Sequence, residues 1–236
     1  MIFVTSDPHG YPLDRFMELL EKARFSEADR LYVIGDVIDR NGDGGVAMLR
    51  WIMARENVTL LMGNHEDMLL NCDFLFTTDA ELTDRRKLSL EQEHNLLRWQ
   101  RNGAMVTIEN LMDLKREDPA ALAALLDDVR KAPLYMEVAI PGKRFVLVHG
   151  GLGGFSPDKG LDEYDRDDLI WTRPDPEDRY WDDRLVILGH TPTWYYKKAD
   201  RMFKTKTWID IDTGAAGGGS PMLLRLDDMK AFYADS

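Results

Sequence analysis

An α/β fold is predicted by three features of the 236-residue sequence. Short apolar runs alternate with helical patterns near the N-terminus, and the next stretch is helical without convincing strands. From residue 134 onward, most apolar runs have the length and composition of strands. Because strands that alternate with helices are typical of a parallel sheet, we expect one α/β domain over 1–236, with a helical insertion at about 66–132.

Two strand-helix-strand units are predicted in the N-terminal region. Apolar runs at 2–5 and 31–34 stop at polar loops, and 12–24 between them carries apolar side chains at helical spacing. Residues 43–55 have the same helical spacing, and 58–62 form a third apolar run. The pattern predicts three parallel strands joined by two helices.

Capping residues mark the helices of the insertion. Ser89 and Gln92 have the spacing of a capping box, and Gly103 lies where a C-terminal cap belongs. Asp118 and Pro119 supply an N-cap and a first-turn proline for a further helix.

The C-terminal half has mainly the pattern of strands. These runs are 134–140, 144–149, 185–190, 207–212, 221–227 and 230–234. Between the second and third of them, residues 151–183 are rich in Gly, Asp and Pro. We interpret this stretch as a long ordered loop, which in a compact domain is more often functional than idle.

Composition excludes several classes of protein. The formal charge of −12 disfavours a nucleic-acid-binding surface. Cys72 is the single cysteine, so an intrachain disulfide or thiolate cluster is impossible, and any metal must bind to oxygen and nitrogen. The chain starts without an export signal and contains no apolar run of the roughly 18 to 20 residues that span a bilayer. We therefore expect a cytoplasmic protein without a membrane partner.

Five predicted strands are followed by short motifs that contain Asp, His or Asn. These are SDPHG at 6–10, GDVIDRN at 35–41, GNHE at 63–66, HGG at 149–151 and GHTPT at 189–193. Open α/β sheets bind ligands beyond the carboxyl ends of their strands. Four of the five histidines lie in these motifs, and imidazole and carboxylate are the ligands that divalent transition metals prefer when thiolate is absent. The motifs therefore predict a metal site with nitrogen and oxygen ligands.

In this order, the five motifs resemble those of the calcineurin-like metallophosphoesterases. The chain is most similar to the PPP-type serine/threonine phosphatases, particularly the small bacterial and bacteriophage lambda-type enzymes. WTRP at 171–174 and IDTGAAGGG at 211–219 extend the resemblance. It implies a metallophosphoesterase sandwich, in which two mixed β-sheets are flanked by helices.

The resemblance also implies a set of metal ligands. Asp7, His9 and Asp36 would bind one ion, and Asp36, Asn64, His149 and His190 would bind the other. The first choice of cofactor is two Mn²⁺ ions, with Fe, Zn, Co or Ni as alternatives. A hydroxide that bridges the ions would attack phosphorus directly, without a phosphoenzyme.

Four further residues match catalytic positions of the family. His65 would protonate the leaving oxygen, and Asp39 would hold its imidazole in the required tautomer. Arg40 and Arg173 would bind the phosphoryl oxygens, together with Asn64. The alternative for Arg173 is an ordinary surface arginine in a charged loop.

Two positions depart from the family pattern. Asn41 stands where the family usually has glycine, and because asparagine tolerates a left-handed backbone, we expect the turn to be retained. Pro8 replaces a common aliphatic residue and should stiffen its loop without removing a ligand.

The expected activity is phosphomonoester hydrolysis, with phosphoserine or phosphothreonine in proteins as the leading substrate and small phosphoesters as a further possibility. The alternative enzyme is a symmetrical diadenosine tetraphosphate hydrolase, which shares the motifs. A non-catalytic protein that binds phosphorylated partners is disfavoured, because no ligand or acid is missing from the motifs. The oligomeric state is left open.

Several residues outside the motifs have simpler interpretations. We expect His94 to be a solvated side chain and Cys72, Trp51 and Trp99 to pack in the core.

Two features near the motifs keep two interpretations each. The segment WYYKKADR at 194–201 could help to choose the substrate, or could be an ordinary hairpin with exposed lysines. Asp212 could support a metal-binding histidine or cap a glycine turn, and it is left out of the predicted site.

Overall fold

Two five-stranded mixed sheets form the centre of the molecule in the computed structural model, which describes residues 1–77, 88–198 and 201–234. The first sheet has the order β10-β9-β1-β2-β3 and the second β4-β5-β6-β8-β7. The strands of the first sheet are β1 (Ile2–Thr5), β2 (Arg30–Val33), β3 (Val58–Leu60), β9 (Met222–Arg225) and β10 (Lys230–Tyr233). Those of the second are β4 (Tyr135–Ile140), β5 (Lys143–Val148), β6 (Leu185–Leu188), β7 (Phe203–Lys204) and β8 (Trp208–Asp210).

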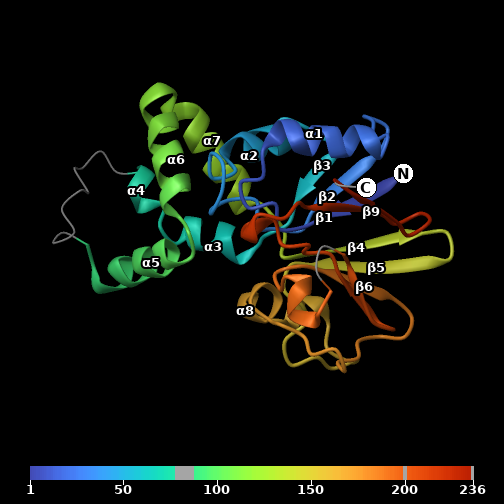
Figure 1. The fold of residues 1–236 in the computed structure, drawn as a ribbon. Coiled ribbons are helices and arrows are strands. Elements are labelled where there is room, and N and C mark those ends of the chain that lie inside the picture. The colour runs from blue at the N-terminus through green and yellow to red at the C-terminus, as the bar shows by residue number, and fades with distance from the viewer. Residues whose placement is uncertain (78–87, 199–200, 235–236) are drawn as a thin grey trace.

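The predicted strand-helix-strand units are confirmed. Strands β1, β2 and β3 are parallel neighbours, connected by α1 (Leu13–Lys22) and α2 (Val46–Met53). Both helices cover the outer face of the first sheet, and the second sheet lies against its other face (Figure 1).

Alternation of side chains along the strands builds the layers. In β5, Phe145 and Leu147 point into the core between the two sheets, whereas Val146 and Val148 point to the outer face. The inner cluster also contains Val4 of β1. This period of two is what a strand buried on both faces requires, and it confirms the predicted sandwich.

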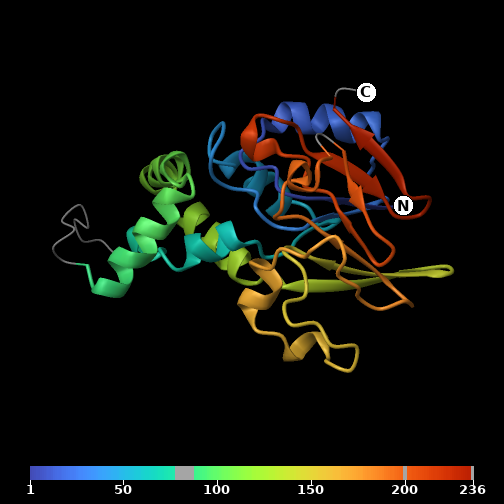
Figure 2. The same ribbon diagram turned by 60° about the horizontal axis from the view of Figure 1, so that its bottom comes forward.

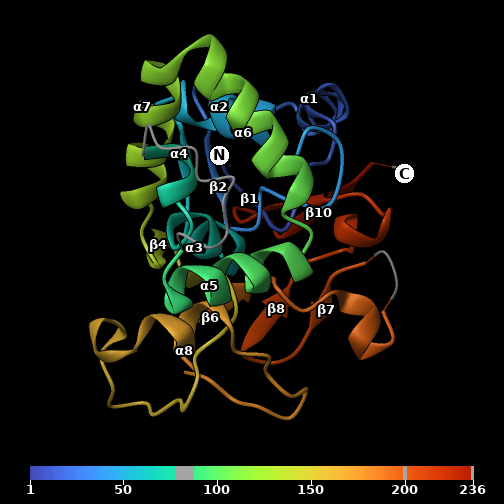
Figure 3. The same cartoon turned by 90° about the vertical axis from the view of Figure 1, so that its left-hand side faces the viewer.

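The predicted helical insertion begins directly after β3. Its helices are α3 (Asn64–Leu70), α4 (Phe74–Thr77), α5 (Leu90–Arg101), α6 (Met105–Glu117) and α7 (Pro119–Arg130). Helices α4 to α7 lie beside one end of the sandwich (Figures 2 and 3). Their buried faces belong to the same hydrophobic cluster as α1 and α2, so the insertion packs on the helical layer. Residues 78–87 of the predicted insertion lie outside the described residues.

The caps predicted for the insertion are present. The Ser89 hydroxyl accepts the Gln92 N–H at 3.1 Å, and the Gln92 amide oxygen accepts the Ser89 N–H at 3.0 Å. Asp118 accepts the N–H of Ala121 at 2.9 Å. Both helices therefore begin where the sequence predicts.

Other predicted boundaries are wrong by one to three residues. Helix α2 starts at Val46 because Gly44 and Gly45 have positive φ angles of 69° and 78°. Strand β3 ends at Leu60, since the Met62 N–H bonds to the Pro133 carbonyl instead of to β2.

The predicted loop at 151–183 and the hairpin interpretation of 194–201 need correction. The loop contains a 3₁₀ turn at Leu161–Glu163 and the helix α8 (Arg166–Ile170). Thr193–Tyr196 form a 3₁₀ turn, η3, because the Lys197 N–H bonds back to the Trp194 carbonyl. Residues 199–200 lie outside the described part. Within the described ranges, every helix is too short or too polar to cross a membrane.

Candidate active site

All ten predicted site residues lie at one edge of the sandwich. The motifs there follow β1, β2 and β3 of the first sheet and β5 and β6 of the second. The six predicted metal ligands are almost completely buried: Asp7, His9, Asp36, Asn64, His149 and His190. The edge therefore gathers polar side chains that would be costly to bury without partners.

Asp36 lies at the centre of this cluster. One of its carboxylate oxygens is 3.5 Å from Nε2 of His9 and 3.7 Å from Nε2 of His65. The other oxygen is 3.2 Å from Nε2 of His149, which is also 2.9 Å from the amide oxygen of Asn64. Asp36 consequently contacts side chains from three other motif loops.

Two groups of side chains in the described residues could hold a metal ion, and Asp36 belongs to both. One group is His9, Asp36 and His65, and the other is Asp36, His149 and His190. The first differs from the sequence prediction in one residue, since His65 takes the place of Asp7. The Asp7 carboxylate lies 3.9 Å from Nε2 of His9, at the margin of the same group.

The tautomers of the histidines fit a metal site. Nδ1 of His9 lies 2.9 Å from the Ile38 carbonyl, and Nδ1 of His149 lies 2.8 Å from the Ile34 carbonyl. A carbonyl can only accept, so each Nδ1 carries the hydrogen and Nε2 faces Asp36. Nε2 of His190 is buried and has no hydrogen-bond partner. Imidazole nitrogens, carboxylates and an amide oxygen form a donor set suited to divalent transition metals.

Burial lowers the pKa values of two of the histidines, whereas neighbouring charges raise the pKa of a third. Burial lowers the pKa of His9 to about 3 and that of His190 to about 2, so both are in the neutral form that binds metal. Burial also acts to lower the pKa of His149, but Asp36 and Asp7 outweigh it and raise this pKa to about 10. Because Nε2 of His149 faces oxygen atoms, either a proton or a cation must lie there, and a divalent ion would displace the proton.

The pKa values of the Asp7 and Asp36 carboxyl groups shift in opposite directions. Burial raises the pKa of Asp7 to about 7, with Asp36 adding to the rise. Burial acts in the same direction on the pKa of Asp36, but nearby imidazoles, His149 first, hold it well below its usual range. Asp36 is thus in the ionised form that can bind a cation.

The backbone of the motif loops is strained. Nine described residues other than glycine have a positive φ, and six of them are predicted site residues. These six are Asp7, His9, Asp36, Asp39, Arg40 and His190. Such conformations cost energy and persist only where the surroundings fix them, which is typical of functional sites.

The turn at Asn41 is retained as predicted, but Asn41 does not adopt the left-handed backbone that was the reason for the prediction. Asp39, Arg40 and Gly42 adopt the left-handed conformation, and Asn41 does not. The Asn41 side-chain amide instead donates to the carbonyl oxygens of His9 and Ala215, at 3.0 and 3.1 Å. Asn41 therefore ties together three segments that line the site.

Glu66 belongs to the GNHE motif but is not among the predicted site residues. Its buried carboxylate accepts the backbone N–H groups of Asp36 and Val37, both at 2.8 Å, and of Gly63 at 3.1 Å. These bonds hold the loop after β2 against the start of α3. The carboxylate thereby fixes the backbone positions of both Asp36 and Asn64.

His65 and Asp39 form the predicted pair. Nδ1 of His65 donates to Asp39 at 2.6 Å, and both side chains are buried. Burial acts to lower the pKa of His65, but Asp36 and Asp39 outweigh it and raise this pKa. On the other side of the ring, Nε2 of His65 lies 3.3 Å from Nη2 of Arg40.

The helical insertion holds the Asp39 carboxylate. The indole N–H of Trp99 in α5 donates to one Asp39 oxygen at 2.8 Å, and the hydroxyl of Thr107 in α6 donates to the other at 2.6 Å. The predicted core position of Trp99 is confirmed, since the side chain is fully buried. Its polar contact was not predicted, because a buried tryptophan at helical spacing has the pattern of ordinary core.

A cleft of about 340 Å³ opens over the buried cluster. Its lining includes Arg40 and Arg173, so the structure places both predicted arginines beside the candidate ligands. Nη1 of Arg173 donates to the His190 carbonyl at 3.1 Å and lies 3.3 Å from the Thr191 hydroxyl. Two guanidinium groups at such a cleft can bind an anionic group.

Asp212, left out of the predicted site, also lines the cleft. Its carboxylate accepts the Gly214 N–H at 2.9 Å, which matches the interpretation as a turn cap. Burial, followed by Asp7, raises the pKa of Asp212 well above its usual range. The remaining predictions outside the motifs hold, since Cys72 and Trp51 are buried and His94 is exposed.

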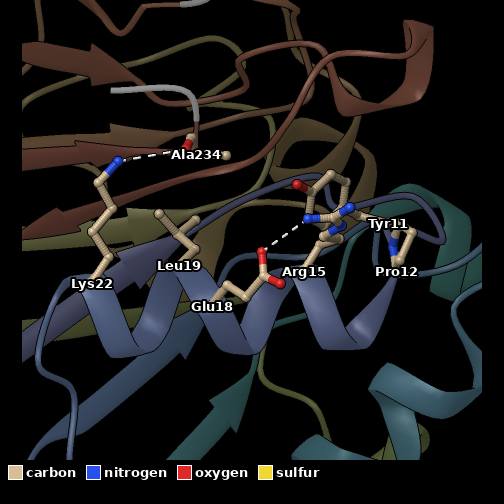
Figure 4. Close-up of a pocket in the computed structure, with 7 residues that line it drawn as sticks. All are labelled: Tyr11, Pro12, Arg15, Glu18, Leu19, Lys22 and Ala234. Atoms are coloured by element: carbon tan, nitrogen blue, oxygen red, sulfur yellow. Dashed lines mark hydrogen bonds and ion pairs between the residues drawn. The ribbon is translucent and has the colours of Figure 1, made fainter.

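A second hollow, of about 510 Å³, lies beside α1 and contains none of the predicted site residues (Figure 4). Its charged side chains have partners on the protein: Arg15 pairs with Glu18 at 3.2 Å, and Lys22 donates to the Ala234 carbonyl at 3.4 Å. The two groups of side chains that could hold a metal among the described residues lie instead at the cleft over Asp36.

Comparison with known proteins identifies the family. The family model described as calcineurin-like phosphoesterase matches residues 1–211. The chain is 25% identical to the symmetrical bis(5'-nucleosyl)-tetraphosphatase of Nitrosospira multiformis, over 99% of this chain and 95% of that protein.

Solved structures share the fold at lower identity. A putative diadenosine tetraphosphatase has a TM-score of 0.58 and 15% identity, with coverage of 98% of this chain and 90% of the other. A protein serine/threonine phosphatase from Saccharomyces cerevisiae has a TM-score of 0.54 and 15% identity, with coverage of 98% and 79%. A cold-active protein tyrosine phosphatase has a TM-score of 0.55 and 18% identity, with coverage of 95% and 73%.

Replacing Trp99 by phenylalanine tests the contact between the insertion and Asp39. Trp99→Phe keeps an aromatic ring in the core but leaves a buried carboxylate oxygen without one donor. Trp51→Phe is the matched control, because the Trp51 indole N–H is buried and has no hydrogen-bond partner. We expect Trp99→Phe to lower the free energy of unfolding by about 1 to 3 kcal/mol more than Trp51→Phe, measured by urea denaturation. Equal losses would show that the Trp99 hydrogen bond contributes nothing.

Proposed function

Because the chain belongs to the calcineurin-like phosphoesterase family, we propose that its cleft hydrolyses phosphate esters with the help of two divalent metal ions. The observation that carries the proposal is the position of Asp36, which belongs to both groups of potential metal ligands. One carboxylate shared by two ions is the arrangement that two-metal hydrolysis needs.

We assign the ligands of the two ions as the motifs predict. Asp7, His9 and Asp36 bind the first, and Asp36, Asn64, His149 and His190 bind the second. Asp7 is preferred to His65 in the first set because Nε2 of His65, the ring nitrogen that does not face Asp39, lies beside the Arg40 cation. Mn²⁺ is the first choice of metal, and Fe, Zn, Co and Ni also suit these donors. When bound, the two ions would lower the pKa of a water molecule toward neutrality and offset the charge of the phosphate.

The remaining site residues act on the substrate. Arg40 and Arg173, with Asn64, bind the phosphoryl oxygens and stabilise the charge that develops on them. His65 donates a proton to the leaving oxygen as its bond to phosphorus breaks. Asp39 keeps the His65 ring in the tautomer and orientation that this transfer requires.

Two substrate classes are supported by different observations. The motif resemblance supports phosphoserine and phosphothreonine in proteins. The relative that matches 99% of the chain is a symmetrical tetraphosphatase, and this match supports a dinucleoside tetraphosphate. Hydrolysis of phosphoserine or phosphothreonine releases inorganic phosphate and an alcohol. Hydrolysis of the dinucleoside tetraphosphate breaks one P–O–P linkage.

Replacing His65 by asparagine tests the proposed proton donor. His65→Asn should lower kcat roughly a hundredfold to ten-thousandfold, because the leaving oxygen then departs without a proton. Metal content should stay at the wild-type value, since His65 is not an assigned ligand. The control is His94→Asn, which changes an exposed histidine on α5. Unchanged turnover in His65→Asn would remove this residue from the mechanism.

A single assay tests the activity and ranks the two substrate classes. Metal-stripped protein is restored with one cation at a time and given a phosphothreonine peptide and diadenosine tetraphosphate in parallel. Faster release of phosphate from the peptide supports the first class, and faster release of ADP supports the second. The proposed function fails if neither substrate is hydrolysed with Mn²⁺, Fe²⁺, Zn²⁺, Co²⁺ or Ni²⁺.

A further inference from the structure

Two exposed aromatic side chains line the candidate active-site cleft. Trp194 is 63% exposed and Tyr195 is 57% exposed, and both contribute to the same lining as Asp36 and Arg173. The other exposed large hydrophobic side chains within the described ranges are aliphatic: Met1, Met17, Leu90 and Met105. Exposed aromatic surface is therefore concentrated at the cleft, where it marks a binding surface.

The backbone that carries this aromatic pair is held in place by hydrogen bonds and packing. The two residues belong to η3, whose Thr193 N–H bonds to the Asp212 carbonyl at 2.8 Å. The next side chain, Tyr196, is buried, donates its hydroxyl to the Pro174 carbonyl at 2.9 Å and stacks on Phe203 with ring centroids 4.5 Å apart. The exposed rings thus project from an ordered turn that is tied to the loop of Arg173.

Charge and burial indicate the shape of the ligand. The candidate metal ligands are buried, whereas Trp194 and Tyr195 are exposed, so a ligand that reaches both has its phosphate inside and its ring outside. Arg40 and Arg173 add positive charge to the cleft of a chain whose formal charge is −12. The cleft therefore suits a molecule that combines an anionic group with a planar ring.

We propose that Trp194 and Tyr195 form a binding site for the base of a nucleotide substrate. This inference rests on the proposed function and names its substrate class. In a nucleotide with two or more phosphates, a ribose and the α-phosphate separate the base from the β-phosphorus, so the base can reach the exposed rings when that phosphorus reacts. The side chains of phosphoserine and phosphothreonine have no ring to stack, and the ring of phosphotyrosine stays one oxygen away from the buried phosphorus.

Binding of two non-hydrolysable probes tests the site apart from catalysis. Adenosine 5'-methylenediphosphonate and methylenediphosphonate carry the same anionic group, with and without a nucleoside, and are titrated calorimetrically into Mn²⁺-loaded protein. We expect the nucleoside to tighten binding about tenfold or more, as base stacking on an aromatic side chain does elsewhere. Trp194→Ala should remove most of this advantage, and Trp194→Phe should retain most of it. Equal affinity of the wild-type protein for both probes overturns the proposal.

Hydrolysis separates failure of this site from failure of the proposed function. The ratio of kcat/KM for diadenosine tetraphosphate to that for tripolyphosphate should fall about tenfold in Trp194→Ala and stay at the wild-type value in Met17→Ala, an exposed residue of α1. An equal loss for both substrates, or a similar loss for a phosphothreonine peptide or phenyl phosphate, overturns the nucleotide assignment. If no substrate is hydrolysed but probe binding depends on Trp194, the base site stands and the proposed hydrolysis fails.

Discussion

The burial of one carboxylate, Asp36, among imidazoles from other loops is the constraint on which the site depends. An ionised carboxylate in this position needs compensating positive charge, which either a proton on His149 or a bound cation can supply. Glu66 reinforces the constraint, since its carboxylate accepts two backbone N–H groups from the loop of Asp36 and one from Gly63, just before α3. The strained φ angles of the motif loops are consistent with a backbone shaped for ligands, at some expense of its own stability.

The helical insertion is connected to the chemistry through Asp39. Trp99 and Thr107 approach this carboxylate from two helices that lie 60 and 68 residues further along the chain. The proposed proton donor, His65, is therefore oriented by a part of the fold that carries no motif of its own. In the same way, the turn that carries Trp194 is fixed by contacts to the loop of Arg173, so the proposed base site and phosphate site share one support.

The sequence predicted that the polar side chains of the motifs gather beyond the strand ends, because metal chemistry restricts residue types and the topology of the sheets brings strand ends together. It did not predict Glu66, Trp99 or Thr107, since their roles depend on which backbone or carboxylate they face in space. Asn41 shows a different kind of error. Its substitution for glycine suggested a left-handed residue, but the structure places that conformation at its neighbours and uses its side chain as a link between loops.

The proposed chemistry requires that two metal ions share Asp36. Crystals of the protein grown with Mn²⁺ and measured near the manganese absorption edge test it directly, because anomalous scattering locates each ion without reference to activity. We expect two peaks, about 3.5 to 4 Å apart, with one carboxylate oxygen of Asp36 in contact with both ions or one oxygen contacting each. A single peak, or a second peak that does not contact Asp36, would contradict it.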